Sequence, residues 1–511
     1  MSSTTTKTTS PTTPALGHAV ARGFSWMIAQ TLGTKGINTT ANIVLAWLLA
    51  REDFGLIGLA YTVTAFVSVL QRAGLREILI HRHAQFRRWA NPVFWMSLTL
   101  GIGGMLLTLA SIPLVVRIYQ EPKLAGLLAI LSLNAPLSAL LVVPQAKLSN
   151  QLRFKAQSLI VVTVALVQAM IACTLAWRGW GAYSIAVAMV TSIAVNALIQ
   201  WSLAPHRPGI RLRIRRWWYL MGDSAALTIM SALWTVTSQG DFIMLGIFHD
   251  AVQTGLYYFA FNLSMQTVTL FTDNLGNVLF PTLSKLQEDP HRQTQAFILA
   301  SRMLALVTIP ACFLQAALAD PAIRLIFPDK WAPAIPVVQI LCIGMAFRAV
   351  GAPGQSLMQS QGRFKTLMIF HGALSATFII SVGMAAAFGG LVAVALAESL
   401  VFVVLWPVVC YLGIRYGGGR WREVSRIYTP AMIGSVLAIT PGWAAAMMLP
   451  SMPYGNVVRI SLICASSLLF YWLIMPRLAP ADWNGLWERF HQMLKRTSSP
   501  IAASVSVNRG N

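Results

Sequence analysis

Fourteen apolar segments, each about 20 residues or longer, follow one another along the chain and restrict what it can fold into. The first covers residues 23–49 and the last covers residues 455–476, and short links with turn residues join them. About 20 helical residues are needed to cross a bilayer core. Only 11% of this chain is charged, against about 25% in soluble domains. The sequence therefore predicts an all-α integral membrane protein with about 14 transmembrane helices, twelve or thirteen being the alternative counts.

Lysine and arginine residues gather on one side of the predicted membrane. If the N-terminus is cytoplasmic, 28 of the 38 basic residues lie on the cytoplasmic side, 7 lie on the opposite side and 3 lie within spans. A bias of this kind in short loops sets the orientation of membrane proteins. It accounts for the net charge of +22 without a nucleic-acid partner. We expect a multi-pass protein with both termini in the cytoplasm.

Two short sequence patterns each occur twice at similar topological positions. The string Gln-x-Arg-Phe-Lys follows the fourth span at residues 151–155 and the tenth span at residues 361–365. The turn around Gly55 after the first span resembles the turn around Gly255 after the seventh. This spacing predicts two six-helix lobes in the same orientation plus two extra C-terminal helices, and parallel repeats are typical of transporters. The predicted parts are a disordered cytoplasmic tail (1–21), an N-lobe (22–203), a basic cytoplasmic linker (204–217), a C-lobe (218–414), two further helices (415–476) and a second cytoplasmic tail (477–511).

Polar side chains form stripes along one face of three predicted helices. Residues three or four positions apart lie on the same face of a helix, so each stripe can line a hydrated cleft that a substrate crosses. The alternative is that these Asn, Ser and Thr side chains hydrogen bond neighbouring helices. The stripes consist of Thr31, Lys35, Asn38 and Asn42 in span 23–49, of Ser231, Thr235, Ser238 and Asp241 in span 218–247, and of Asn262, Gln266, Asp273 and Asn277 in span 252–280.

Charged residues inside the spans are few. A charge at the centre of the bilayer costs about 2.5–3.5 kcal/mol on insertion scales, so it needs a partner or a wet cavity. We take Asp241, Asp273 and Glu398 as candidates for coupling transport to protons or sodium. Arg348 is a candidate contact for a phosphate or an anionic sugar, because a guanidinium binds phosphate in a bidentate way. For Arg348 and Arg302, an ion pair that holds a neighbouring helix is an equal alternative.

The sequence offers no pattern for catalysis, for a metal ion or for a cofactor. The eight histidines are scattered, and none lies with acids at a metal-ligand spacing. The chain has no lysine-containing phosphate loop of an ATPase, and no Ser or Cys is paired with a His as a nucleophile. We therefore expect a protein that is not an enzyme and needs no cofactor.

Three stretches resemble the Wzx-type flippases of the polysaccharide transporter family. VLFPTLSKLQED (278–289) resembles the end of the eighth helix of that family, and EDFGLIGLAYTVTAFVSVLQRAGLREILIHR (52–82) is similar to its second helix. The most specific likeness is IRLIFPDKWAPAIPVVQILCIGMAFRAVGAPGQSLMQSQGR (323–363), which resembles the entry into the tenth helix. The likeness extends over most of residues 20–480 and is greatest to colanic-acid-exporter-like members.

The resemblance implies a fold and a function. The implied fold is that of the MOP superfamily, with two six-helix bundles that alternate access to a central cleft. The implied substrate is an undecaprenyl-pyrophosphate-linked oligosaccharide, carried from the cytoplasmic to the periplasmic leaflet of the bacterial inner membrane. Its partners would be this lipid-linked oligosaccharide, the membrane lipids, and the polymerase and export machinery. Lys35 and Arg348 become candidate contacts for its anionic headgroup, and only Arg348 falls on a landmark of the family.

Other functions compete with this one. A multidrug or cation antiporter of the same fold would need an acidic cleft, whereas the cleft candidates here have both signs of charge. A membrane-embedded polysaccharide polymerase would need a large outer loop, and the longest predicted outer segment, around residues 319–332, is too short. An assembly scaffold would not need charges within its spans.

Overall fold

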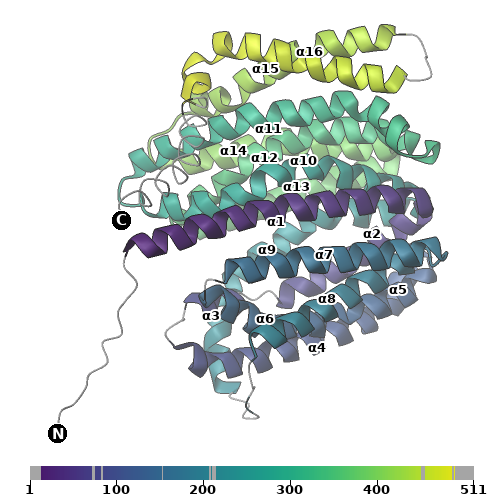
Figure 1. Ribbon diagram of the computed structural model, residues 1–511, viewed down its shortest axis with the longest axis vertical. Helices are drawn as coiled ribbons and strands as arrows, with labels where there is room; N and C mark the ends of the chain where they lie inside the picture. Colours follow the sequence, from purple (N-terminus) through teal and green to yellow (C-terminus); the bar gives the residue numbers. More distant parts are fainter. Residues whose placement is uncertain are drawn as a thin grey trace, which may run out of the picture. The chain divides into compact units, whose positions relative to one another are not determined.

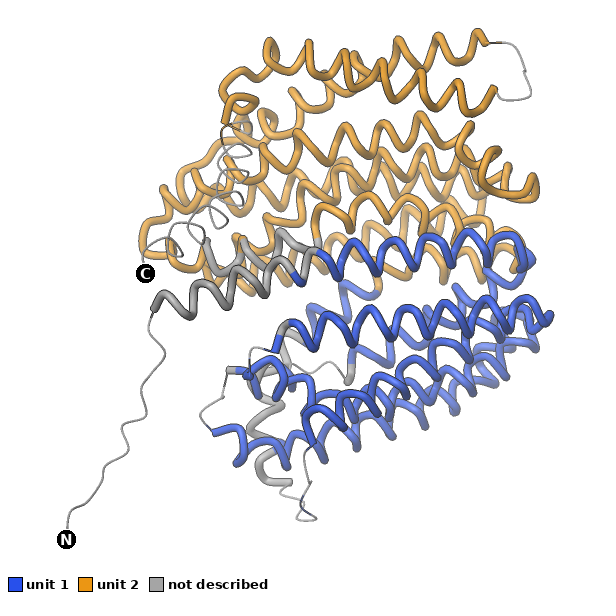
Figure 2. Tube along the Cα trace, viewed as in Figure 1, with its two compact units in different colours: residues 1–235 blue, residues 236–511 orange. Residues whose placement is uncertain are grey.

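Every regular element of the described residues is a helix, and Cα packing divides the chain into two compact units (Figures 1 and 2). This computed structural model describes residues 13–71, 75–81, 85–151, 153–205, 209, 214–449, 455–485 and 488. Residues 1–12 and 489–511 of the two predicted tails lie outside the described residues, as do residues 206–208 and 210–213 of the predicted linker. Unit 1 comprises residues 1–235 and unit 2 comprises residues 236–511.

Unit 1 contains eight helices and the first part of a ninth within the described residues. The first helix begins at Thr13, so residues 13–21 are helical although the sequence predicted a disordered tail there. Thr-Pro is a common helix start, because proline fits the first helical turn. The helices are α1 (Thr13–Leu48), α2 (Arg51–Gln71), α3 (Leu75–His81), α4 (Phe86–Tyr119), α5 (Lys123–Ser132), α6 (Asn134–Asn150), α7 (Phe154–Trp177) and α8 (Tyr183–Leu203), followed by α9 (Ile214–Phe248), which contains the boundary between the units.

Unit 2 is built around α12 (Ile335–Ser360), which packs against α10 (Ala251–Ser284), α11 (Pro290–Ile326) and α14 (Leu391–Arg415). In the apolar window of α12, 78% of the residues are buried, against 11% in α16 (Gly455–Leu478). Figure 1 shows α15 (Trp421–Met448) lying beside α16. The remaining elements are the short 3₁₀ helix η2 (Asp329–Ala334) and α13 (Phe364–Phe388).

The helices match the predicted transmembrane spans. Eleven helical stretches among the described residues are long and apolar enough to cross a membrane. The other three predicted spans correspond to α1, α9 and α10, which are 36, 35 and 34 residues long and carry the three polar stripes. The predicted fold class, an all-α membrane protein with about 14 spans, is confirmed. The fourth span is divided into two helices, because α5 ends and α6 begins on either side of Leu133.

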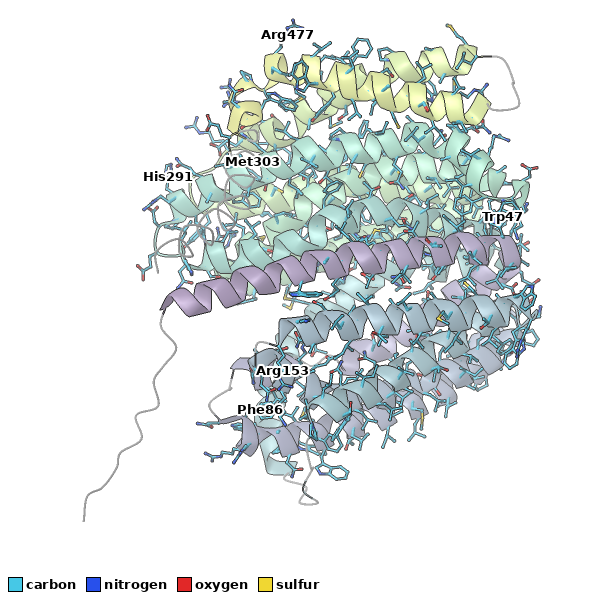
Figure 3. All side chains as sticks on the ribbon, in the orientation of Figure 1. Trp47, Phe86, Arg153, His291, Met303 and Arg477 are labelled. Atoms are coloured by element: carbon cyan, nitrogen blue, oxygen red, sulfur yellow. The ribbon has the colours of Figure 1, made fainter. Side chains whose placement is uncertain are left out.

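Both copies of each repeated pattern have the same backbone geometry. Within the Gln-x-Arg-Phe-Lys strings, the N–H of Arg153 donates to the carbonyl of Leu148, and the N–H of Arg363 donates to that of Met358. Gly362, with φ of +69°, provides the left-handed residue of this helix end in the second copy. Figure 3 labels Arg153, which precedes α7 in the first copy. Similarly, α1 and α9 end at residues 48 and 248, and α2 and α10 begin at residues 51 and 251. The two units therefore share local features that support an internal repeat.

Glycines allow α12 and α14 to approach each other closely. A Cβ atom on Gly344 would lie 2.6 Å from the Cα of Ser399, and one on Gly351 would lie 2.7 Å from the Cβ of Trp406. One turn further along, Gly354 lies against the backbone of Cys410. Small residues at such an interface bring helices together in a membrane, where association depends on packing. This contact holds Arg348 on α12 beside the acidic residue of α14 that is described below.

Asp53 connects two turns at one end of unit 1. One carboxylate oxygen accepts a hydrogen bond from the N–H of Ala50, 2.9 Å away, and the other accepts from the N–H of Ala182, also 2.9 Å away. The first bond caps the start of α2, and the second fixes the turn before α8. The neighbouring residue, Glu52, pairs instead with Lys123 at 2.7 Å on the surface.

We expect Asp53→Ala to lower the stability of unit 1 by roughly 2–4 kcal/mol, because two backbone donors lose a charged acceptor. Glu52→Ala is the matched control. It should leave the thermal midpoint nearly unchanged, because the pair with Lys123 is exposed and screened by solvent. The measurement is the temperature at which the detergent-solubilised protein loses its monodisperse gel-filtration peak. Equal midpoints for the two variants would contradict the role assigned to Asp53.

Candidate functional site

Four side chains from four helices of unit 2 form a buried charge cluster. They are Asp241 on α9, Tyr257 on α10, Arg348 on α12 and Glu398 on α14. Asp241 and Glu398 are each 1% exposed, and Tyr257 is fully buried. A buried carboxylate is costly unless a cation, a proton or hydrogen bonds compensate for its lost hydration. The arrangement of these four side chains therefore shows how the two acids are accommodated.

Tyr257 brings the two acids together. Its hydroxyl donates a hydrogen bond to a carboxylate oxygen of Glu398. Its ring packs edge-on against Phe242, the residue after Asp241, with ring centroids 5.7 Å apart. Asp241 and Glu398 interact electrostatically with each other. The Tyr257 hydroxyl and the backbone N–H of Phe242 interact with the Asp241 carboxylate, but neither of its oxygens has a hydrogen bond of normal geometry. The two acids therefore have different surroundings, and Asp241 is the less well satisfied of the two.

Arg348 supplies the positive charge of the cluster. Its guanidinium interacts electrostatically with both Glu398 and Asp241. The guanidinium carbon lies 5.5 Å from the ring centroid of Phe402, which is one turn after Glu398 on the same helix. Arg348 is half-buried, whereas both acids are almost fully buried. Arg348 is therefore the charged member of the cluster that keeps accessible surface.

Three members of the cluster lie near helix ends, whereas Arg348 lies near the middle of α12. Asp241 is seven residues before the end of α9, Tyr257 is six residues after the start of α10, and Glu398 is seven residues after the start of α14. At 1.5 Å per residue, each side chain is attached about 10 Å from its helix end. Such a depth is compatible with access from one side of the membrane.

Three of the predicted site residues, Asp241, Arg348 and Glu398, meet in this cluster although they are far apart in the sequence. Tyr257 was missed. The sequence shows a hydroxyl-bearing residue inside an apolar span, but no local pattern indicates that Glu398 is its partner. Because Arg348 interacts electrostatically with both acids, its surroundings are also compatible with the predicted alternative of an ion pair between helices.

The other predicted site residues are placed elsewhere. Asn262 is half-buried on α10 and donates to the carbonyl of Tyr258 at 2.8 Å, and Gln266 is half-buried one turn further along. On α1 in unit 1, Lys35 is half-buried, whereas Asn38 and Asn42 are exposed. Asp273 and Asn277 lie outside the residues whose side chains are described.

A family model described as polysaccharide biosynthesis protein matches residues 44–336, which is more than half of the chain. The chain belongs to this family. The succinoglycan biosynthesis transport protein ExoT of Rhizobium meliloti is 24% identical over 431 residues, covering 84% of this chain and 85% of that protein. The lipopolysaccharide biosynthesis protein WzxC of Escherichia coli K12 is 23% identical over 401 residues, covering 76% of this chain and 80% of that protein.

Solved structures show the fold of this family member. The lipid II flippase MurJ, in an inward closed conformation, superposes with a TM-score of 0.70 at 13% identity and covers 88% of this chain and 98% of its own. A MATE structure in complex with MaD3S gives a TM-score of 0.54 at 15% identity and covers 80% of this chain and 96% of its own. These likenesses confirm the predicted MOP fold.

The charge cluster has no counterpart at the matching positions of the first repeat. The spacing of 200 residues between α1 and α9, and between α2 and α10, places Ala41 opposite Asp241 and Ile57 opposite Tyr257. The spacing of 210 between the repeated strings places Ser138 opposite Arg348. α8, which corresponds to α14, contains no charged residue. The two repeats of this polysaccharide biosynthesis protein therefore share their helices but not their charges.

Arg302 has a structural role in this family member. Its guanidinium pairs with Asp482, 3.6 Å away, in the helical residues that follow α16. Next to this pair, the Tyr471 hydroxyl donates to the carbonyl of Leu306 at 2.6 Å. Met303, labelled in Figure 3, marks this position on α11. Of the two sequence alternatives for Arg302, the ion pair that holds a neighbouring helix is the one observed.

No group of three or more His, Cys, Asp or Glu side chains that could hold a metal ion occurs among the residues that the structure describes.

Proposed function

We propose that this protein is a flippase that moves undecaprenyl-pyrophosphate-linked oligosaccharides from the cytoplasmic to the periplasmic leaflet of the bacterial inner membrane. The observation that carries the proposal is its membership of the polysaccharide biosynthesis family over residues 44–336. The relatives named as transport and biosynthesis proteins for succinoglycan and lipopolysaccharide support it. The fold shared with a lipid II flippase is consistent with a large lipid-linked cargo.

A carrier is required because the oligosaccharide headgroup is polar and charged. Moving such a group unaided through hydrocarbon would cost many hydrogen bonds and the solvation of its charges. The polar residues on α1 and α10 are the proposed contacts for this headgroup, namely Lys35, Asn38, Asn42, Asn262, Gln266 and Asn277. Because the protein moves its substrate without changing covalent bonds, it needs neither a catalytic residue nor a cofactor.

The buried charge cluster is the proposed site of ion coupling. Asp241 and Glu398 lie among apolar helices, where a change in charge alters helix packing at high energetic cost. Coupling requires that the ion binds two conformations with different affinity, and in a cluster shared by four helices a movement of one helix would change that affinity. Asp273 remains a further candidate from its position in the sequence. With both termini in the cytoplasm, as the Lys and Arg bias favours, the cluster would lie in the periplasmic half of the membrane.

Deletion of the gene tests the proposed function. The expected result is loss of surface polysaccharide together with accumulation of undecaprenyl-linked repeat units on the cytoplasmic side. These intermediates are identified by mass spectrometry of lipid extracts, and their leaflet is determined with a periplasmic glycosidase or lectin. Expression of the intact chain from a plasmid should restore export. Normal export in the deletion strain would exclude this substrate class, and a drug-resistance assay in an efflux-deficient host would then test the antiporter alternative.

A further inference from the structure

The buried charge cluster does not balance its own charge. Its three ionisable members at neutral pH are two carboxylic acids, Asp241 and Glu398, and one guanidinium, Arg348. With both acids ionised, the sum is one negative charge in a region of low dielectric constant. One further monovalent cation makes the cluster neutral, and a second one would give it a net positive charge.

Hydrogen bonding distinguishes the two acids. Glu398 accepts from the Tyr257 hydroxyl and lies on the same face of α14 as Phe402, over which the Arg348 guanidinium is placed. Asp241 is equally buried, but its two carboxylate oxygens lack hydrogen bonds of normal geometry. An ionised carboxylate in this condition is far more costly than a protonated one. Asp241 is therefore the acid at which the additional cation is needed.

The chemistry of the cluster suits a proton better than a metal ion. Hard cations such as Ca²⁺ and Mg²⁺ take about six or more oxygen ligands in proteins, whereas the four side chains of this cluster offer the oxygens of Asp241, Glu398 and Tyr257. A proton, in contrast, needs one carboxylate oxygen and no coordination shell.

We propose that Arg348 sets the ion specificity of the transporter: its guanidinium acts as a built-in second cation, so that the cluster takes up one proton, at Asp241, and excludes sodium. This inference rests on the proposed transport function. In the step itself a proton from water binds one oxygen of the Asp241 carboxylate and yields a neutral carboxylic acid, and no other bond changes. Other titratable side chains on the surrounding elements include Tyr258 on α10, which packs on Phe242, Cys342 on α12, Cys410 and Tyr411 on α14, and His371 on α13.

The test counts protons on the purified full-length protein and needs no substrate. Infrared difference spectra between alkaline and neutral buffer report the carbonyl band of buried carboxylic acids that are protonated at neutral pH. The wild type should give a band equivalent to one acid, and Asp241→Asn should remove it. Glu398→Gln should also remove it, because the charges of Asp241 and Arg348 then cancel. His371→Gln is the control and should leave the band unchanged.

Removal of the Arg348 guanidinium is expected to increase the band, whereas removal of either acid is expected to abolish it. Arg348→Gln should double the band, since both acids must then be neutralised by protons. In this variant, replacing choline chloride by sodium chloride should change the intensity of the band. The double variant Arg348→Gln/Glu398→Gln should restore a single acid. A wild-type band that sodium diminishes, or a band in Arg348→Gln equal to that of the wild type, would overturn the proposal. If Arg348→Gln does not fold, Glu398→Gln decides the matter, because a retained band contradicts the charge balance. A result from these spectra stands whether or not deletion of the gene affects polysaccharide export.

Discussion

Replacing Asp241 by Asn and Glu398 by Gln in one variant is expected to reduce polysaccharide export by about tenfold or more and to make the residual export independent of the proton gradient. The physical reason is that an ion can drive a conformational change only through different affinities for the two states. Without an ionisable acid in the cluster, the gradient has no group on which to act. A tenfold loss corresponds to about 1.4 kcal/mol in the barrier of the slowest step, which is modest for the removal of two buried charges.

The measurement is the rate at which labelled repeat units appear at the cell surface, with and without a protonophore, at matched protein levels. Glu288→Gln is the control, because Glu288 is an exposed acid in the same unit. Asp273→Asn is measured separately and in combination with the other two substitutions. If the triple variant exported at the wild-type rate with an unchanged response to the protonophore, ion coupling by these acids would be wrong.

Substitution of Gly344 by Ala is expected to deplete the folded protein, although alanine is the better helix former. A methyl group at Gly344 would lie 2.6 Å from the Cα of Ser399 on α14, and backbone atoms cannot yield as a flexible side chain can. Overpacking of this kind typically costs about 1–3 kcal/mol, and more where the backbone is rigid. Because this contact also positions Arg348 beside Glu398, a shift of α12 would disturb the charge cluster as well.

Gly372→Ala is the matched control. Gly372 lies within α13 and has no atom within 4 Å of the position where a Cβ would be added. Its replacement should be neutral or stabilising, by up to about 1 kcal/mol, from helix propensity alone. The yield of monodisperse protein and its thermal midpoint distinguish the two variants. A similar midpoint for both would mean that α12 and α14 are not held as closely as described.

Much of the fold follows from the sequence, because each span must hydrogen bond its own backbone groups and must be apolar over about 20 residues. The doubled Gln-x-Arg-Phe-Lys string also predicted a repeat, since its backbone geometry is local. The division of the fourth span at Leu133 was not predicted. Asn134 and Pro136 follow Leu133 closely and are local signals for a new helix, because proline fits the first helical turn.

The site was predicted only in part, for a physical reason. Asp241, Arg348 and Glu398 stood out because charges are rare within spans. Their assembly depends on how α9, α10, α12 and α14 pack, and that packing is a tertiary property without a local signal. The same holds for Arg302, whose partner Asp482 comes after the last predicted span. Polar stripes alone did not predict that the Asn262 side chain donates to the carbonyl of Tyr258 on its own helix.

The charged residues of the buried cluster all lie in the second repeat, and this has a consequence for protein engineering. If hybrid proteins were made by joining halves of two relatives that use different ions, ion preference should follow the donor of residues 236–511. The half that provides residues 1–235 would be interchangeable in this respect, because Ala41, Ile57 and Ser138 carry no group that changes its charge near neutral pH. Substitutions that change the driving ion would then accumulate in the half of the gene for residues 236–511, while the other half adapts to a new sugar.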